Sequence, residues 1–219
     1  MKWEGVFTQD YNILDFETSG LNESLDHIIE IGLLEVRNTA HNTPISWIVN
    51  PNFPEAFHIP SKVTDMTGIT DTQLMYGADP KELFPSFIQR IRWLPVWGHN
   101  LLRFDVTFIN EECGRICTIP PPKETWFDTA AIFKAYQLSL PGQEWAQEPG
   151  ILNEIENYSN FYDYGMYVLD KRIKGLYYNL PFCCETLGVD ASDIRFHRAG
   201  GDCIATYRVR EALKQIILG

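Results

Sequence analysis

Residues 11–37 read YNILDFETSGLNESLDHIIEIGLLEVR, and the expected architecture is built outward from this stretch. Its first part, 11–16, is a short apolar run that ends in an acid, which predicts a strand. Its last part, 28–37, is too apolar for a half-exposed strand and predicts a central one. The polar segment between them begins with SGL, which predicts a turn. The stretch therefore predicts two strands, with acidic side chains at the end of the first.

The segments after this stretch mix strand and helix patterns. Further strands are predicted at 44–50 and 93–98, and helices at 61–66, from Asp71, at 80–92, 104–117, 127–138 and 200–217. Region 139–179 is rich in Pro, Gly and polar residues and then in Tyr, so we expect an insertion or lid on the core rather than a second domain. The mixture of elements predicts an α/β or α+β layer fold and a single domain over residues 1–219.

Composition limits the classes of protein that the chain could be. The chain has 219 residues, of which 45% are hydrophobic, which is enough to bury a core without disulfides. Its 18 Lys and Arg against 29 Asp and Glu give a net charge of −11, which weighs against tight binding of duplex DNA or of anionic membranes. We find no apolar run of about 18 residues, as a membrane helix would need, and no signal-peptide pattern at the start. The odd count of five Cys predicts reduced thiols and a cytoplasmic location.

Acidic residues with a useful spacing stand at the end of the first strand. Residues two apart on a strand point to the same face, so Asp15 and Glu17 present carboxylates to one site, where they would suit Mg²⁺ or Mn²⁺. Alone, this pair is more simply explained as a solvated strand end. Asp105 and Asp202 each lie near the expected start of a helix, where a capping acid is ordinary, and a lone His197 is weak evidence of a catalytic base.

Taken together, these residues form three spaced motifs. In chain order they are DFETSGL at 15–21, GHNLLRFD at 98–105 and HRAGGD at 197–202. This order and spacing resemble the DEDDh (DnaQ-like) 3′-5′ exonucleases, a family that includes the proofreading ε subunit of DNA polymerase III, the exonuclease domain of PolC, RNase T and oligoribonuclease. The similarity extends to IIEIG on the second strand, to MTGIT at 66–70 and to FDTA at 127–130. The resemblance implies an RNase H-like α/β fold, with a central mixed five-stranded sheet flanked by helices.

The resemblance also implies roles for individual residues. It implies two Mg²⁺ or Mn²⁺ ions as cofactors, held by four carboxylates, those of Asp15, Glu17, Asp105 and Asp202. It implies that His197 is the general base, and that contacts to the substrate come from Thr18, Leu21, His99 and Asn100. For Leu21, core packing stays an equally good interpretation. Asp128 matches a family position, but we expect it to order the following helix rather than to bind metal.

The implied activity is metal-dependent hydrolysis of phosphodiesters at the 3′ end of single-stranded nucleic acid, with release of nucleoside 5′-monophosphates. DNA is slightly preferred over RNA as the substrate; the alternatives are an RNA-trimming exoribonuclease and a catalytically silent binding module of the same fold. The acidic charge predicts a weak hold on long backbones, hence short substrates or a partner, such as a polymerase, that supplies affinity. No membrane partner is expected. A glycosidase that uses paired carboxylates would leave the GHN and HRAGGD segments unexplained.

Two further patterns allow more than one interpretation. The KRIK run at 171–174 and the nearby Tyr residues could contact a single strand, although a solvated basic turn with packed aromatic residues is the favoured interpretation. Cys113 and Cys117 could bind zinc together with Cys183 and Cys184, but the spacing is unlike that of common zinc sites and buried thiols are favoured.

Overall fold

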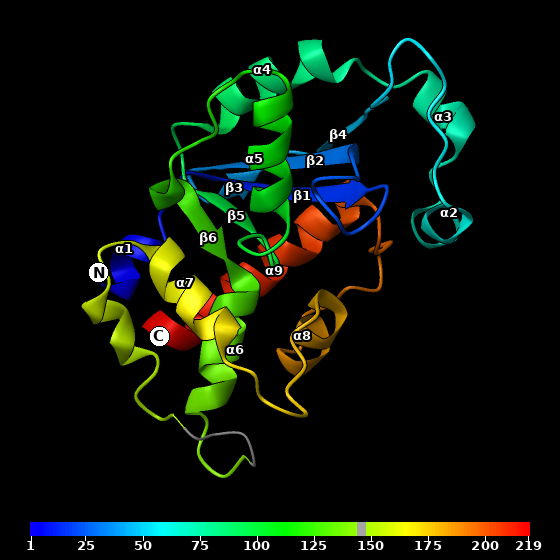
Figure 1. The fold of residues 1–219 in the computed structure, drawn as a ribbon. Coiled ribbons are helices and arrows are strands. Elements are labelled where there is room, and N and C mark those ends of the chain that lie inside the picture. Colours follow the sequence, from blue (N-terminus) through cyan, green and yellow to red (C-terminus); the bar gives the residue numbers. More distant parts are fainter. Residues whose placement is uncertain (144–147) are drawn as a thin grey trace.

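The computed structural model describes residues 1–143 and 148–219 and contains a mixed sheet in its centre (Figure 1). The described strands are β1 (Tyr11–Thr18), β2 (Ile28–Arg37), β3 (Ala40–His41), β4 (Ile45–Ile48), β5 (Val96–Gly98) and β6 (Trp126–Asp128). They pair in the order β3-β2-β1-β5-β6, and β4 also pairs with β2. Strands β1 and β2 are antiparallel, whereas β1, β5 and β6 are parallel to one another. The carboxyl ends of these three parallel strands therefore meet at one edge of the sheet.

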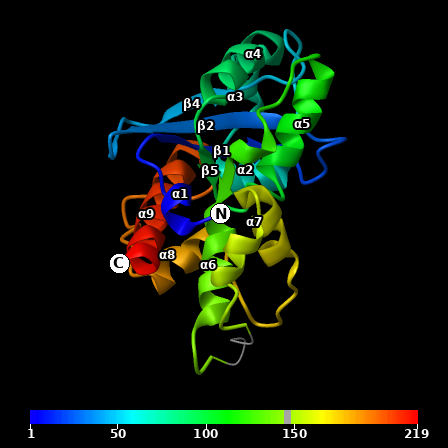
Figure 2. The ribbon, with the colours of Figure 1, turned by 90° about the vertical axis from the view of Figure 1, so that its left-hand side faces the viewer.

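Helices cover both faces of the sheet, so the α/β expectation is confirmed. The described helices are α1 (Trp3–Val6), α2 (Ser61–Thr67), α3 (Asp71–Met75), α4 (Pro80–Ile91), α5 (Asp105–Arg115), α6 (Thr129–Ser139), α7 (Phe161–Asp170), α8 (Leu180–Thr186) and α9 (Ala199–Leu218), with short 3₁₀ turns η1 (Lys123–Thr125) and η2 (Asn153–Asn157). Figure 2 shows α4 on one side of the sheet and α9 on the other. None of the helices in the described ranges is long and apolar enough to cross a bilayer.

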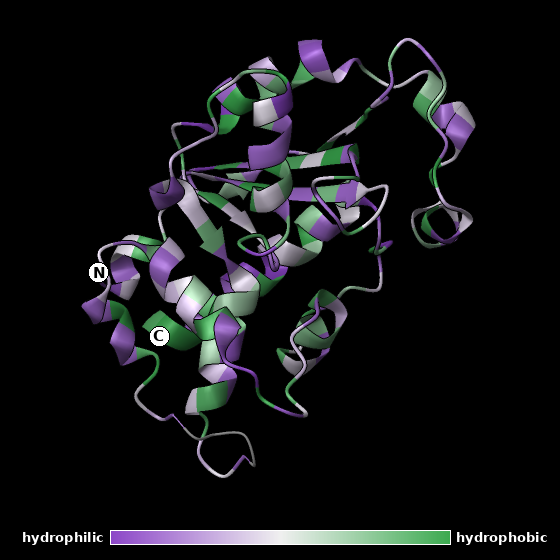
Figure 3. Ribbon diagram, viewed as in Figure 1, coloured by the Kyte–Doolittle hydropathy of each residue, from purple (hydrophilic) through white to green (hydrophobic). Residues whose placement is uncertain are grey.

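The helices form where their apolar residues recur with the helical period. In α4 the buried side chains are Phe84, Phe87, Ile88 and Ile91, which lie three or four positions apart and make one apolar face. Figure 3 shows hydrophilic and hydrophobic segments alternating along α4 and α5, as expected for helices with one buried side. Such helices are stabilised mainly by packing this face against the sheet.

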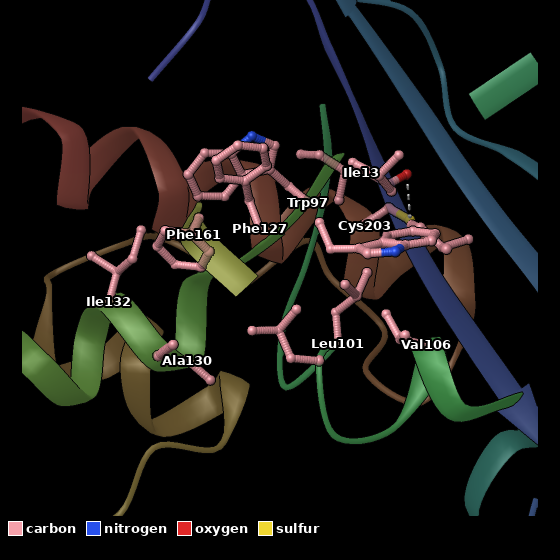
Figure 4. Close-up of a cluster of buried hydrophobic side chains, with 14 of the residues drawn as sticks. Ile13, Trp97, Leu101, Val106, Phe127, Ala130, Ile132, Phe161 and Cys203 are labelled. Carbon is pink, nitrogen blue, oxygen red and sulfur yellow. Dashed lines mark hydrogen bonds between the residues drawn. The ribbon is translucent and has the colours of Figure 1, made fainter. Parts of the chain in front are cut away.

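The main core continues from the sheet into the region around α7. The Trp97 ring stacks on the Phe127 ring, with ring centroids 5.1 Å apart (Figure 4). The Phe127 ring also packs against the ring of Phe161 in α7, with centroids 5.2 Å apart. Region 139–179, which we expected to be an insertion or lid, thus contributes a helix whose buried residues belong to the same cluster as those of the sheet.

Three local expectations differ from the structure. The sheet has six strands among the described residues rather than five, because Ala40–His41 adds a two-residue strand beside β2. Residues 126–128 form β6 and the helix begins only at Thr129, since the apolar run WFD pairs with β5 before Asp128 caps α6. Helix α7 was not expected, because its dense aromatic residues and the Pro and Gly before it concealed the helical period.

Candidate active site

Three of the predicted acids meet at the edge where the parallel strands end. Asp15 and Glu17 leave β1 on the same face, while Phe16 between them points to the opposite face and contacts Phe87 of α4, with ring centroids 6.1 Å apart. Asp202 comes from the first turn of α9. Ligand atoms of the three carboxylates lie within 4.8 Å of one another. Side-chain alternation along β1 and the position of Asp202 in the first turn of α9 therefore bring together acids that lie far apart in the sequence.

Helix α9 approaches the sheet closely because β2 carries a glycine. Gly32 lies opposite Asp15 in the β1–β2 register. A Cβ atom at Gly32 would lie 2.5 Å from the backbone carbonyl carbon and oxygen of Ala199, the first residue of α9. Only glycine lets the helix backbone reach the strand at this point, so Gly32 sets how near Asp202 comes to Asp15.

A buried ion pair fixes the turn that precedes α9. Glu30 of β2 is 1% exposed, and its carboxylate accepts from Arg198 Nε at 3.0 Å and from Arg198 Nη2 at 2.8 Å. Glu30 also accepts the backbone N–H of Ala199 at 3.1 Å. We did not single out Glu30 and Arg198 from the sequence; the available signal was an acid inside the otherwise apolar run 28–37. This bidentate contact holds the segment around His197 against the sheet.

Asp105 lies beside the other acids but outside the group of three. It is the first residue of α5, is 3% exposed, and accepts the backbone N–H of Phe16 through Oδ1 at 3.0 Å. Burial raises the pKa of Asp105 to about 8. Burial, followed by repulsion from Asp105 and then Asp202, also raises the pKa of Asp15 well above its usual range.

The remaining two acids are held in a similarly unfavourable environment. Burial, then repulsion from Asp202 and Glu30, raises the pKa of Glu17 to about 8. Burial raises the pKa of Asp202 to about 7, and its Oδ1 is buried without a hydrogen-bond partner among the described residues. Crowded carboxylates with an unpartnered oxygen suit a hard divalent cation such as Mg²⁺ or Mn²⁺, which would offset their mutual repulsion. The donor set therefore fits the metal that the sequence predicts.

His197 belongs to the same turn as Asp202. Its backbone is left-handed, with φ of 60°, and its N–H donates to Asp202 Oδ2 at 3.1 Å. The side chain is exposed and lines a pocket of about 330 Å³ together with the four acids, His99 and Asn100. The structure thus brings all seven of these predicted residues to one pocket.

His99 and Asn100 are also tied to the protein itself. The His99 Nδ1 atom lies 2.9 Å from Thr129 Oγ1, and Nε2 lies 2.7 Å from the carbonyl oxygen of Tyr178. Burial lowers the pKa of His99 to about 4, so the ring is neutral and donates from Nε2 to Tyr178. Asn100 donates its backbone N–H to Asp128 Oδ1 at 3.0 Å. His99 therefore also holds the segment before α8 in place.

Asp128 has the structural role that we expected. Its carboxylate accepts four backbone N–H groups, those of Asn100, Leu102, Ala130 and Ala131. It caps α6 and fixes the turn after β5.

Of the predicted substrate residues of the first motif, Thr18 ends β1 and Leu21 lies on the loop that follows. Thr18 is 8% exposed and donates from Oγ1 to the carbonyl oxygen of Gly20 at 2.5 Å. Asp26 closes the loop by accepting the backbone N–H of Asn22 at 2.9 Å. Leu21 is 84% exposed, so the core-packing interpretation of this residue is wrong.

Zinc ligation by the cysteines has no support in the structure. Within residues 1–143 and 148–219, no group of three or more potential ligands gathers except Asp15, Glu17 and Asp202. Cys113, Cys183 and Cys184 are buried free thiols and Cys117 is an exposed one. Burial of the thiol, the favoured interpretation, thus holds for Cys113, Cys183 and Cys184 but not for Cys117.

Known proteins resemble the chain in both sequence and fold. The RNase_T exonuclease family model matches residues 13–210. A PolC-type DNA polymerase III of Caldanaerobacter subterraneus is 30% identical over 113 residues, which is 52% of this chain and 8% of that protein. The corresponding protein of Mycoplasma pneumoniae is 25% identical over 207 residues, which is 93% of this chain and 11% of that protein. The chain thus spans about a tenth of the length of these relatives.

Solved structures share the fold. E. coli exonuclease I in complex with a 5cy-dT13 oligonucleotide superposes with a TM-score of 0.66 at 16% identity, over 96% of this chain and 41% of that one. The expectation of an RNase H-like exonuclease fold is thereby confirmed. Since the family model extends over nearly the whole chain, from β1 into α9, the protein belongs to the exonuclease family.

Proposed function

We propose that the protein is a metal-dependent 3′-5′ exonuclease that removes nucleotides from the end of a single strand. The observation that carries the proposal is the meeting of Asp15, Glu17 and Asp202 within 4.8 Å, in a pocket that Asp105 and His197 also line. Membership of the exonuclease family supports the reaction class. The oligonucleotide complex of exonuclease I and the polymerase relatives favour DNA over RNA as the substrate.

Four carboxylates would hold the metal. Asp15, Glu17 and Asp202 provide the nearest oxygens, and Asp105 adds a fourth charge beside them. We propose two Mg²⁺ or Mn²⁺ ions, because four buried negative charges are offset by two divalent cations. When bound, such ions stabilise the negative charge that develops on the attacking and leaving oxygens.

His197 would act as the general base. Its ring lines the pocket, and its backbone N–H is bound to Asp202 Oδ2, so the base and a metal ligand are held in one turn. The imidazole would take a proton from the attacking water as the water oxygen bonds to phosphorus. The bond from phosphorus to the 3′ oxygen of the preceding nucleotide would break, and that oxygen would take a proton from solvent. The terminal residue would leave as a nucleoside 5′-monophosphate.

The end of the strand would be held by the residues around the acids. We expect the backbone and hydroxyl of Thr18 to contact the terminal 3′ hydroxyl, and the exposed Leu21 to pack against the last base. Asn100 would line the other side of the pocket, while His99 would keep that wall in place through Thr129 and Tyr178.

The test uses a 5′-labelled single-stranded DNA and its RNA counterpart, incubated with Mg²⁺, Mn²⁺ or EDTA. We expect a ladder that shortens from the 3′ end, needs the metal and disappears in Asp15→Asn. A matched control is Glu124→Gln, an exposed acid of η1, which should behave as wild type. Faster shortening of RNA would support an RNA-trimming enzyme, and no ladder on either strand would support a silent binding module.

A further inference from the structure

A second hollow, rich in cations, adjoins the active-site pocket. It has a volume of about 450 Å³, and we call it the basic pocket; the residues that matter here are Arg103, Lys134, Lys171, Arg172, Lys174 and Tyr178. Five cations around one hollow are unexpected in a chain of net charge −11. Three of them come from the run 171–174, for which the sequence favoured a solvated basic turn.

The two pockets have no lining residue in common, but residues that neighbour one another line them, and His99 of the active-site pocket lies 2.7 Å from the carbonyl oxygen of Tyr178 of the basic pocket. Arg103 lines the basic pocket, while the next two residues, Phe104 and Asp105, line the active-site pocket. Tyr178 lines the basic pocket, and Asn179 directly after it lines the active-site pocket. The basic pocket therefore lies next to the active-site pocket on the side of Phe104 and Asn179.

Two of the five cations are available to an anion. Arg103 is paired with Asp170, and Lys171 with Glu148 at 2.8 Å. Lys134 is 2% exposed and donates to the carbonyl oxygen of Leu169 at the end of α7. This leaves two residues of the basic pocket, Arg172 and Lys174, which are exposed and have no carboxylate within 4.0 Å among the described residues.

An exposed aromatic ring follows these cations. Most tyrosines of this region pack inward; Tyr164, for example, is fully buried. Tyr177 differs, because it is 63% exposed and its ring touches that of Phe182 in α8, with centroids 6.0 Å apart. Uncompensated cations followed by an exposed ring are typical of surfaces that hold a single strand by its phosphates and stack its bases.

We propose that the basic pocket binds the phosphodiester backbone of the substrate strand on the 5′ side of its terminal nucleotide. This inference rests on the proposed function, because it takes the strand's 3′ end to lie at the four acids. Arg172 and Lys174 contact successive phosphates there, and the pocket gives an otherwise acidic protein a local hold on a single strand. A dinucleotide ends before it reaches the pocket, whereas a longer strand fills it.

The test compares Arg172→Gln/Lys174→Gln with wild type on a dinucleotide and on a single strand of about twelve nucleotides. We expect KM for the longer strand to rise about tenfold with kcat retained, and the dinucleotide to be hydrolysed as by wild type. The slope of log affinity against log salt should become shallower by about 1.4, since each phosphate contact to a single strand contributes about 0.7. Arg172→Lys/Lys174→Arg should restore both values, and Lys2→Gln/Lys81→Gln, which removes exposed cations elsewhere, should change neither.

The outcomes separate this inference from the proposed function. If wild type hydrolyses both substrates and the double variant affects them equally, the basic pocket is not a backbone site although the exonuclease stands. If wild type hydrolyses neither, the exonuclease fails, and binding of the labelled strand in EDTA still tests the pocket. Inorganic phosphate should compete with the strand no better than chloride at equal ionic strength; stronger competition would make the hollow a site for a free anion and overturn the proposal. Melting curves of each variant confirm that the fold is retained.

Discussion

Replacing Glu17 with Gln should stabilise the protein when no divalent metal is present. The carboxylate is 7% exposed and lies among other acids, and its pKa is raised from 4.5 to about 8. A raised pKa means that the folded state favours the protonated form. The corresponding stability is complete below pH 4.5 and is lost as the pH rises through 8. An amide cannot ionise, so the variant avoids this loss.

The size of this stabilisation follows from how far the pKa of Glu17 is raised. At about pH 7 the solution is roughly 2.5 pH units above the ordinary pKa of Glu, and each unit corresponds to about 1.4 kcal/mol, which sets an upper limit of about 3 kcal/mol. Neighbouring acids share part of the repulsion by taking up protons, so a gain of roughly 1–3 kcal/mol in the free energy of unfolding is expected. For a domain of this size, that gain raises Tm by about 3–10 °C.

Thermal melting of wild type, Glu17→Gln and the surface control Glu124→Gln measures this effect, first in EDTA and then with Mn²⁺. In EDTA the Glu17 variant should melt above the other two proteins. Adding Mn²⁺ should raise the Tm of the Glu17 variant by less than it raises the Tm of the other two proteins, because the variant has lost a metal ligand. A lower Tm in EDTA, or an undiminished gain with Mn²⁺, would refute the argument that repulsion between these carboxylates is offset by metal.

Three further predictions concern other parts of the site. His197→Ala should lower kcat about 10²–10⁴-fold, while Mn²⁺ should still raise the Tm of the variant as it does for wild type. Full activity in a single-turnover assay would exclude a general base at this position. Gly32→Ala should lower the free energy of unfolding by roughly 1–3 kcal/mol, because the new Cβ forces α9 and Asp202 away from β1. It should also abolish the rise in Tm on adding Mn²⁺. Unchanged melting curves would show that the backbone of Ala199 can move to accept the new Cβ. In wild type without metal, Tm should fall between about pH 5 and 8, because over this range Glu17 and Asp202 are ionised in the unfolded chain but keep their protons in the folded one up to pKa values of about 8 and 7. Mn²⁺ should flatten that fall. A metal-free Tm that rises over this range would contradict the sign expected from the raised pKa values.

Much of this architecture could be predicted from local patterns. The predicted strand 28–37 matches β2, β1 extends two residues beyond the predicted 11–16, and the period-two spacing correctly placed Asp15 and Glu17 on one face. The meeting of these acids with Asp202 came from the family resemblance, since no local pattern relates one end of the chain to the other. The ion pair of Glu30 and Arg198 could not be foreseen, because a buried acid is recognised only when its partner is known.

The region after α6 was harder to interpret. Its composition predicted an insertion or lid on the core but not the helix α7, which packs into the main core. The basic pocket arises only when Arg103, from the turn before α5, and Lys134 of α6 come beside the run 171–174. Sequence neighbours alone did not show that these cations surround one hollow.

The contacts between β1 and α9 have a consequence for how the molecule reaches its native state. Cys203 in α9 lies against the backbone of Ile13, 190 positions away along the chain, and Arg198 meets Glu30 across 168 positions. Such distant contacts carry a large loop-closure entropy and slow the search for the native topology. During synthesis, at about 5–20 residues per second, β1 and β2 are complete many seconds before α9 emerges. The crowding of carboxylates that destabilises the metal-free protein is thus complete only after α9 has brought Asp202 to Asp15 and Glu17.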